Sequence, residues 1–162
     1  MLLARAVHSA RIVRPARALA TTSSQLPRKI CLSDAFAKIR EPWSPRIAGD
    51  VNECQAKLAR LEGEFVWQHH EEEDELFLVW RGAMRMRFRD GDVDLSEGEL
   101  IVVPRGVEHC PVALSEACEV VLLERNSTLN TGSAAAALGD AQHERTKEGR
   151  TLTKPTLERV GD

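Results

Sequence analysis

Four side chains in two short segments have the chemistry of metal ligands: Gln68, His70 and Glu75 in the first segment, and His109 in the second. In an extended strand Gln68 and His70 project from the same face, and a turn through the acidic run that follows lets Glu75 begin the neighbouring strand. A tight turn at residues 104–106 places His109 on a further strand, where its imidazole can enter the same interior. Two imidazoles, a carboxylate and an amide oxygen form a shell suited to a divalent metal ion.

Alternating apolar and polar residues predict the strands that must position these ligands. The period is two at residues 65–68 and 84–89, and short apolar runs follow at residues 76–80, 100–103 and 120–123. Turns rich in Gly, Pro and Asp separate these runs at close intervals. Many short strands joined by tight turns indicate an all-β sandwich or barrel, which we expect over residues 43–126.

The flanks of this barrel are expected to differ from it. Leu32, Ala35, Phe36 and Ile39 fall at helical spacing, which predicts a short amphipathic helix over residues 31–42 that the following prolines end. Residues 127–162 lose the strand pattern, and we expect a mostly irregular C-terminal tail.

The N-terminal segment differs in charge from the rest of the chain. Residues 1–33 hold six basic and no acidic residues, whereas the remaining 16 basic and 25 acidic residues give a net charge of −9. Sequence that is rich in Arg and Ala and free of acids is typical of an organelle transit peptide. We expect residues 1–30 to be a disordered transit peptide for the mitochondrion, with a plastid or cytoplasmic location as alternatives.

Composition excludes two classes of partner. The chain is 43% hydrophobic and 29% charged, as in globular domains, but no uninterrupted apolar run reaches the roughly 18 residues that a membrane-spanning helix needs. Aromatic residues make up 4% of the chain and the net charge is −3, which disfavours both base stacking and attraction to phosphates. We therefore expect neither a membrane nor a nucleic acid as partner.

Two motifs in this chain resemble those of the cupin superfamily. The stretch from Gly63 to Gly82 is similar to the first cupin motif, His-x-His, then Glu three or four residues later, then six residues and Gly. The stretch from Gly98 to His109 is similar to the second, Gly, five residues, Pro-x-Gly, two residues and His. The resemblance covers residues 43–124 and implies a double-stranded β-helix, the jelly-roll barrel, which commonly holds one metal ion.

The first motif departs from the family pattern and leaves two registers open. Gln68 with His70 keeps the alternation and a four-residue gap to Glu75, but puts Gln where His is usual. The other register uses His69 and Glu71. We favour Gln68 and His70, because they share a strand face with Val66, while His69 lies with Phe65 and Trp67 on the other face.

The resemblance implies a small single-domain cupin with a divalent metal ion (Fe, Mn or Zn) and a small-molecule ligand or substrate. The reaction classes that such a metal supports are an iron-type dioxygenase and a zinc- or manganese-assisted isomerase or lyase. The alternative is a non-catalytic, metal-free cupin that binds a small ligand or a sugar. We also expect a homodimer, because short sheets leave open edges and residues 43–48 offer apolar surface.

Two further features have simpler interpretations than a functional one. The four cysteines form no Cys-x-x-Cys pair, and we interpret them as reduced thiols, including Cys110 beside His109. Arg85, Arg87 and Arg89 could line an anion site, but a stripe opposite Met84 and Met86 is more simply a solvated or subunit-facing strand face.

Overall fold

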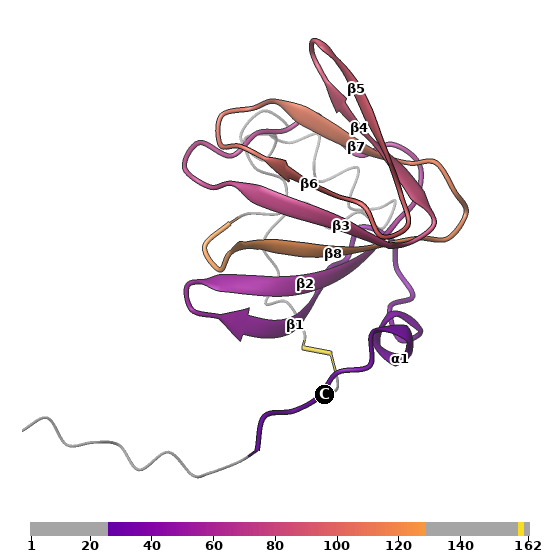
Figure 1. Ribbon diagram of the computed structural model, residues 1–162, viewed down its shortest axis with the longest axis vertical. Coiled ribbons are helices and arrows are strands. Elements are labelled where there is room, and N and C mark those ends of the chain that lie inside the picture. The colour runs from indigo at the N-terminus through magenta and orange to yellow at the C-terminus, as the bar shows by residue number, and fades with distance from the viewer. Residues whose placement is uncertain (1–25, 129–158, 161–162) are drawn as a thin grey trace, which may run out of the picture.

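Two antiparallel β-sheets form the body of the molecule. The computed structural model describes residues 26–128 and 159–160. The strands are β1 (Arg46–Val51), β2 (Cys54–Leu61), β3 (Glu75–Arg81), β4 (Ala83–Phe88), β5 (Gly91–Ser96), β6 (Leu100–Val103), β7 (His109–Ala113) and β8 (Cys118–Arg125). One sheet has the order β1-β2-β8-β3-β6 and the other the order β5-β4-β7 (Figure 1). The predicted all-β jelly-roll fold is confirmed.

The main hydrophobic core lies between the two sheets. On β3 and β8 every second residue points inward, and on β4 Met84 and Met86 are fully buried. This core contains Leu61, Phe77, Val79, Leu95, Val103, Val120 and Leu122 as well as the two methionines. Burial of such side chains stabilises a domain by about 1.5–3 kcal/mol each, before the loss of chain entropy is counted.

The outer face of β4 carries the arginine stripe. Arg85 pairs with Asp94 at 2.6 Å, and Arg89 pairs with Glu108 at 2.7 Å. The guanidinium of Arg89 also lies 3.7 Å from the ring centre of Trp67, a cation–π contact. These arginines have acidic and aromatic partners on a solvated strand face, as the simpler interpretation expects.

The segment before the proposed ligands is not the continuous strand that residues 65–68 predict. It meets β7 only through isolated bridges, from Glu64 to Val112 and from Gln68 to His109. Three residues on this segment therefore face two on β7, which is the one-residue excess of a β-bulge.

Proline in the opposing strand gives a physical reason for the irregular pairing. The amide of Phe65 donates to the carbonyl of Pro111 at 2.9 Å, but Pro111 has no N–H to donate in return. The carbonyl of Phe65 instead lies 3.5 Å from the thiol of Cys110.

The bulge corrects our assignment of faces. Strict alternation puts Phe65 on the face opposite Gln68, yet both line the same cavity inside the barrel. Phe65 stacks on Trp43 with 4.5 Å between ring centres, whereas Trp67 lies on the outer side under Arg89. An extra residue between Phe65 and Gln68 turns both side chains inward.

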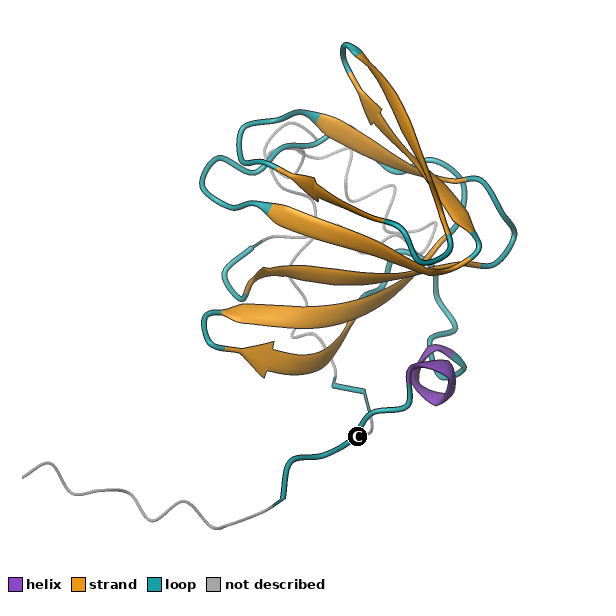
Figure 2. Cartoon of the chain, in the orientation of Figure 1, coloured by secondary structure: helices purple, strands orange, loops and turns teal. Residues whose placement is uncertain are grey.

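Helix α1 (Leu32–Phe36) is shorter than the predicted span of residues 31–42. After Phe36 the backbone bonds close over three residues, from Lys38 to Ala35 and from Ile39 to Phe36, which is the tighter turn that ends many helices. Its apolar side packs with Ile39 against Leu58 of β2. Figure 2 shows the helix outside the two sheets.

Apolar surface at residues 43–48 was one reason to expect a dimer, and that reason is wrong. Trp43 and Ile47 are each only 8% exposed, because Trp43 enters the main core and the indole N–H donates to the carbonyl of Glu62. The larger exposed apolar side chains include Leu100 and Val102 on β6.

Several predictions fall on other parts of the chain. Residues 1–25 of the predicted transit peptide and residues 129–158 of the predicted tail lie outside the described residues. At residues 159–160 the chain pairs with β1, since Val160 donates to the carbonyl of Ile47 at 2.9 Å. Within the described ranges, α1 is far too short to cross a bilayer, and no other helix qualifies as a membrane span.

Candidate metal centre

Three buried side chains with metal-binding atoms meet at one end of the barrel. Glu75 is the first residue of β3, His109 is the first residue of β7, and His70 comes from the loop before β3. Their ligand atoms all lie within 4.8 Å of one another. Oε2 of Glu75 is 3.3 Å from Nε2 of His70 and 3.4 Å from Nε2 of His109.

Backbone hydrogen bonds hold this group in place. Gln68 and His109 exchange both amide–carbonyl bonds, at 2.8 and 2.9 Å, and the amide of Gly106 donates to the carbonyl of His70 at 2.7 Å. Nδ1 of His109 lies 2.9 Å from the carbonyl of Val107, so this nitrogen carries the proton and donates it. The lone pair is then on Nε2, which faces Glu75 as a metal ligand must.

Gln68 reaches the same site through its amide. Its side chain is buried, and Nε2 lies 3.4 Å from Nε2 of His109. Oxygen and nitrogen of an amide are interchangeable by a half-turn, which would place Oε1 at that point. Gln68 is therefore positioned to supply a fourth donor beside His70, Glu75 and His109.

The electrostatics of the group match a cation. Burial raises the pKa of Glu75, but the contacts with His109 and His70 outweigh it and hold this pKa below its usual value. Burial lowers the pKa of His70, but the contact with Glu75 raises it by more, so this pKa lies above its usual value. Nε2 of His70 and Oε2 of Glu75 are buried without a hydrogen bond of good geometry in the described residues. Buried polar atoms are nearly always paired. Two buried atoms whose lone pairs have no hydrogen-bond partner are therefore suited to bind a metal ion.

His69 and Glu71, the ligands of the other register, lie elsewhere. His69 is 29% exposed at its side chain and pairs at 2.8 Å with Glu71, which is 80% exposed. The structure thus brings His70 and not His69 to Glu75 and His109.

Sequence reasoning missed a buried ion pair beside the group. Nζ of Lys57 on β2 donates to Oε1 of Glu124 on β8 at 2.6 Å, and both side chains are 1% exposed. Burial and the charge of Glu75 raise the pKa of Glu124 to about 7. Glu124 shares a strand face with Val120 and Leu122, but Val121 and Leu123 are apolar as well, so the sequence alone does not show that this face is the inward one.

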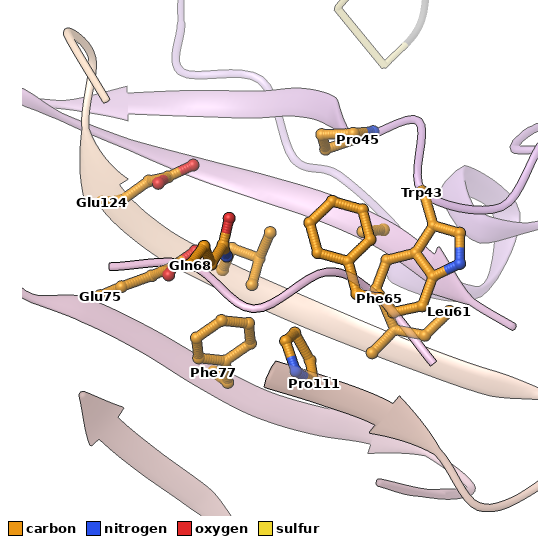
Figure 3. Close-up of a pocket in the computed structure, with 11 residues that line it drawn as sticks. Trp43, Pro45, Leu61, Phe65, Gln68, Glu75, Phe77, Pro111 and Glu124 are labelled. Carbon is orange, nitrogen blue, oxygen red and sulfur yellow. The ribbon is translucent and has the colours of Figure 1, made fainter. Parts of the chain in front are cut away.

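A cavity of about 40 Å³ leads from the candidate metal centre into the barrel. Gln68, Glu75 and Glu124 lie at one end, and Trp43 and Phe65 lie at the other (Figure 3). Cys110, next in the chain to the lining residue Pro111, is buried, and burial raises the pKa of its thiol to about 11, which makes it a poor nucleophile at neutral pH.

Comparison with known proteins points to one family. The model of the Cupin domain matches residues 58–124, which include all of Gln68, His70, Glu75 and His109. The chain is 30% identical over 73 residues to the uncharacterized protein YdbB of Bacillus subtilis (strain 168). The matched residues are 44% of this chain. It spans 65% of the length of that relative.

Solved structures agree in fold. A cupin-2 domain containing protein of Shewanella frigidimarina is 41% identical, with a TM-score of 0.58 over 60% of this chain and 94% of that one. Protein NMB1881 of Neisseria meningitidis is 33% identical, with a TM-score of 0.56 over 61% of this chain and all of that one.

Proposed function

This protein belongs to the cupin superfamily, and we propose that it binds one divalent metal ion and uses it in chemistry on a small molecule. The observation that carries the proposal is the buried convergence of His70, Glu75 and His109, in which Nε2 of His70 and Oε2 of Glu75 have no hydrogen bond of good geometry among the described residues. Gln68 is the fourth proposed ligand.

The residues of this site would have separate roles. His109 presents Nε2 because Nδ1 is held by a backbone carbonyl, and Glu75 supplies a negative charge that a cation balances. A bound divalent ion would supply Lewis acidity and open positions for a substrate oxygen. The apolar side chains that line the cavity, among them Trp43, Phe65 and Phe77, would give a bound substrate surroundings of low polarity. Iron would support a dioxygenase, and zinc or manganese an isomerase or lyase.

Metal analysis of the full chain, purified without added metal and then loaded with Fe(II), Mn(II) or Zn(II), tests the proposal. We expect about one ion per chain, as a single shell requires. The double variant His70→Ala/His109→Ala should lose it, whereas His69→Ala, which alters a neighbouring surface histidine, should keep it. Circular dichroism checks that each variant is still a folded β protein. Unchanged metal content in the double variant would remove the site assignment.

One observation favours a second candidate, a cupin that binds a small ligand without metal. Gln68 stands where the family usually has His, and a neutral amide is a weaker ligand than imidazole for zinc or iron. In that case, a small ligand would bind equally to the chelator-treated and the metal-loaded protein in calorimetry. A ligand that binds only after metal loading would exclude this candidate.

A further inference from the structure

The cavity beside the candidate metal centre has two chemically different ends. Its polar end is formed by Gln68, Glu75 and Glu124, and its walls include the rings of Trp43 and Phe65 (Figure 3). A ligand that satisfies both ends must carry oxygen atoms on one side and hydrocarbon on the other.

Glu124 has a carboxylate oxygen that no described residue satisfies. Oε1 accepts a hydrogen bond from Lys57, which fixes the orientation of the carboxylate, but Oε2 is buried without a partner. A ligand hydroxyl can donate to this oxygen when Glu124 is ionised and accept from it when Glu124 is protonated. A hydroxyl therefore fits Glu124 in either state.

The other end of the cavity is lined mainly by apolar side chains of the described residues. The indole N–H of Trp43 already donates to the carbonyl of Glu62 at 2.8 Å, and its ring stacks on Phe65. The remaining lining there includes Leu61, Pro45 and Pro111. A sugar or polyol would bury hydroxyls without partners, which costs roughly 1–3 kcal/mol for each group.

The size and charge of the cavity narrow the class of ligand further. A volume of about 40 Å³ has room for only a few small groups, so the ligand is short. The charges of Glu75, Glu124 and Lys57, together with a divalent ion, sum to a single positive charge when all are ionised. This balance favours a ligand with one negative charge.

We propose that the cavity binds a short-chain hydroxy acid, with its hydroxyl at Oε2 of Glu124, its carboxylate toward the metal centre and its alkyl part against Trp43 and Phe65. The inference rests on the proposed metal site, since without the ion a carboxylate would face Glu75 unbalanced. Lys57 is the positioning residue that holds Glu124 in place.

Calorimetric titration of the metal-loaded full chain with three probes tests this. Lactate has a carboxylate, a hydroxyl and a methyl group, propionate lacks the hydroxyl, and glycerol is a polyol of lactate's size without the carboxylate. We expect lactate to bind at least about tenfold more tightly than either, as one hydrogen bond to a charged group provides. Propionate or glycerol binding as tightly as lactate would overturn the inference.

A matched pair of variants tests whether the preference for lactate depends on Glu124. Lys57→Met/Glu124→Leu removes both charges of the buried pair, so no unpaired charge remains, and it should abolish the preference for lactate over propionate while keeping the metal. Glu119→Leu removes another buried glutamate of β8 that pairs with Arg81 and does not line the cavity, and it should keep the preference. An unchanged preference in the double variant would overturn the role of Glu124.

Metal content measured on the same samples separates the two proposals. Protein without metal overturns both of them, whereas metal-loaded protein without a preference for lactate overturns the hydroxy acid alone. If the double variant does not fold, the comparison of lactate with propionate in the wild type still decides the ligand class.

Discussion

Neighbouring histidines of this chain have opposite environments. His70 is buried beside Glu75, while His69 pairs with Glu71 at the surface. The difference arises from the direction of each side chain, since His70 is turned into the barrel and His69 is turned to its surface. At the scale of single residues, this orientation distinguishes a proposed metal ligand from a surface ion pair of small energetic effect.

Single substitutions of these two histidines should separate the two registers. His70→Ala should lower metal affinity at least about tenfold, because it removes a ligand, whereas His69→Ala should leave it within about twofold. Competition with a chromophoric chelator measures both affinities on the same metal. Loss of metal from His69→Ala with retention in His70→Ala would show that the other register is correct.

At the scale of elements, the turn between β3 and β4 depends on a glycine. Gly82 has a φ of +84°, and a Cβ there would lie 2.0 Å from the carbonyl oxygen of Ala117 and 2.3 Å from Oγ of Ser115. Ser115 in turn accepts a hydrogen bond from the amide of Ala83 at 3.0 Å. The close approach of the β7–β8 loop therefore requires glycine, in addition to the backbone angle.

A pair of glycine substitutions measures the two effects separately. Gly98 has the same φ of +84° but open space around its missing Cβ. Gly98→Ala should lower the free energy of unfolding by about 1–2 kcal/mol through backbone strain, and Gly82→Ala by about 3 kcal/mol or more because contacts must also move. Urea denaturation measures both values. Equal losses would contradict the role assigned to the β7–β8 loop.

Strands β2 and β8 together bury the pair of Lys57 and Glu124, which should make stability depend on pH. Burial raises the pKa of Glu124 to about 7 from an ordinary value of 4.5. Between these values the folded state holds a proton that the unfolded state has released. The stability contributed by this group is full below pH 4.5 and decreases as the pH rises to about 7.

Urea denaturation of the metal-free protein at pH 5, 6, 7 and 8 measures this dependence. The free energy of unfolding of Lys57→Met/Glu124→Leu should decrease less between pH 5 and pH 7 than that of the wild type, because the variant lacks the group. Glu119→Leu serves as the control and should follow the wild type. Parallel curves for the wild type and the double variant would contradict the assignment.

At the scale of the whole molecule, the described barrel is distinct from the basic N-terminal segment. The proposed ligands all lie between residues 68 and 109. Among the described residues, Ile30 is the first that packs against the cluster of Phe36, Ile39 and Leu58 outside the barrel. We propose that residues 1–30 direct the protein to the mitochondrion. Import and metal binding should then be separable properties.

Two chains test this separation. A protein lacking residues 1–25 keeps Ile30 and should match the metal content and unfolding midpoint of the full chain. A fluorescent protein fused after residues 1–35 should be found in mitochondria by microscopy, because the segment is basic and free of acids through residue 33. Diffuse cytosolic fluorescence would contradict the transit peptide.

Exposed apolar side chains support the proposal of a homodimer through the face that contains β6. Leu100 is 57% exposed and Val102 is 49% exposed, and Trp80 on β3 is 38% exposed. Light scattering of the wild type should give twice the mass of one chain at micromolar concentration, and Leu100→Lys/Val102→Lys should give a monomer. A monomeric wild type would contradict the dimer.

The sequence by itself determined strands β3, β4, β6 and β8 and three members of the candidate site. Period-two alternation is a local property, so Met84 and Met86 identify the inward face of β4 without knowledge of their partners. The spacing of His70, Glu75 and His109 within the two motifs likewise placed all three in one interior.

Only the tertiary structure decided which way Phe65 points and where Lys57 finds its partner. The bulge before Gln68 depends on pairing with β7, in which Pro111 cannot donate, and that pairing joins segments more than 40 residues apart. Lys57 and Glu124 are 67 residues apart, and β2 and β8 become neighbours only when the sheet forms. A buried charge cannot be told from an exposed one until its partner is known, because burial without a partner is too costly to occur.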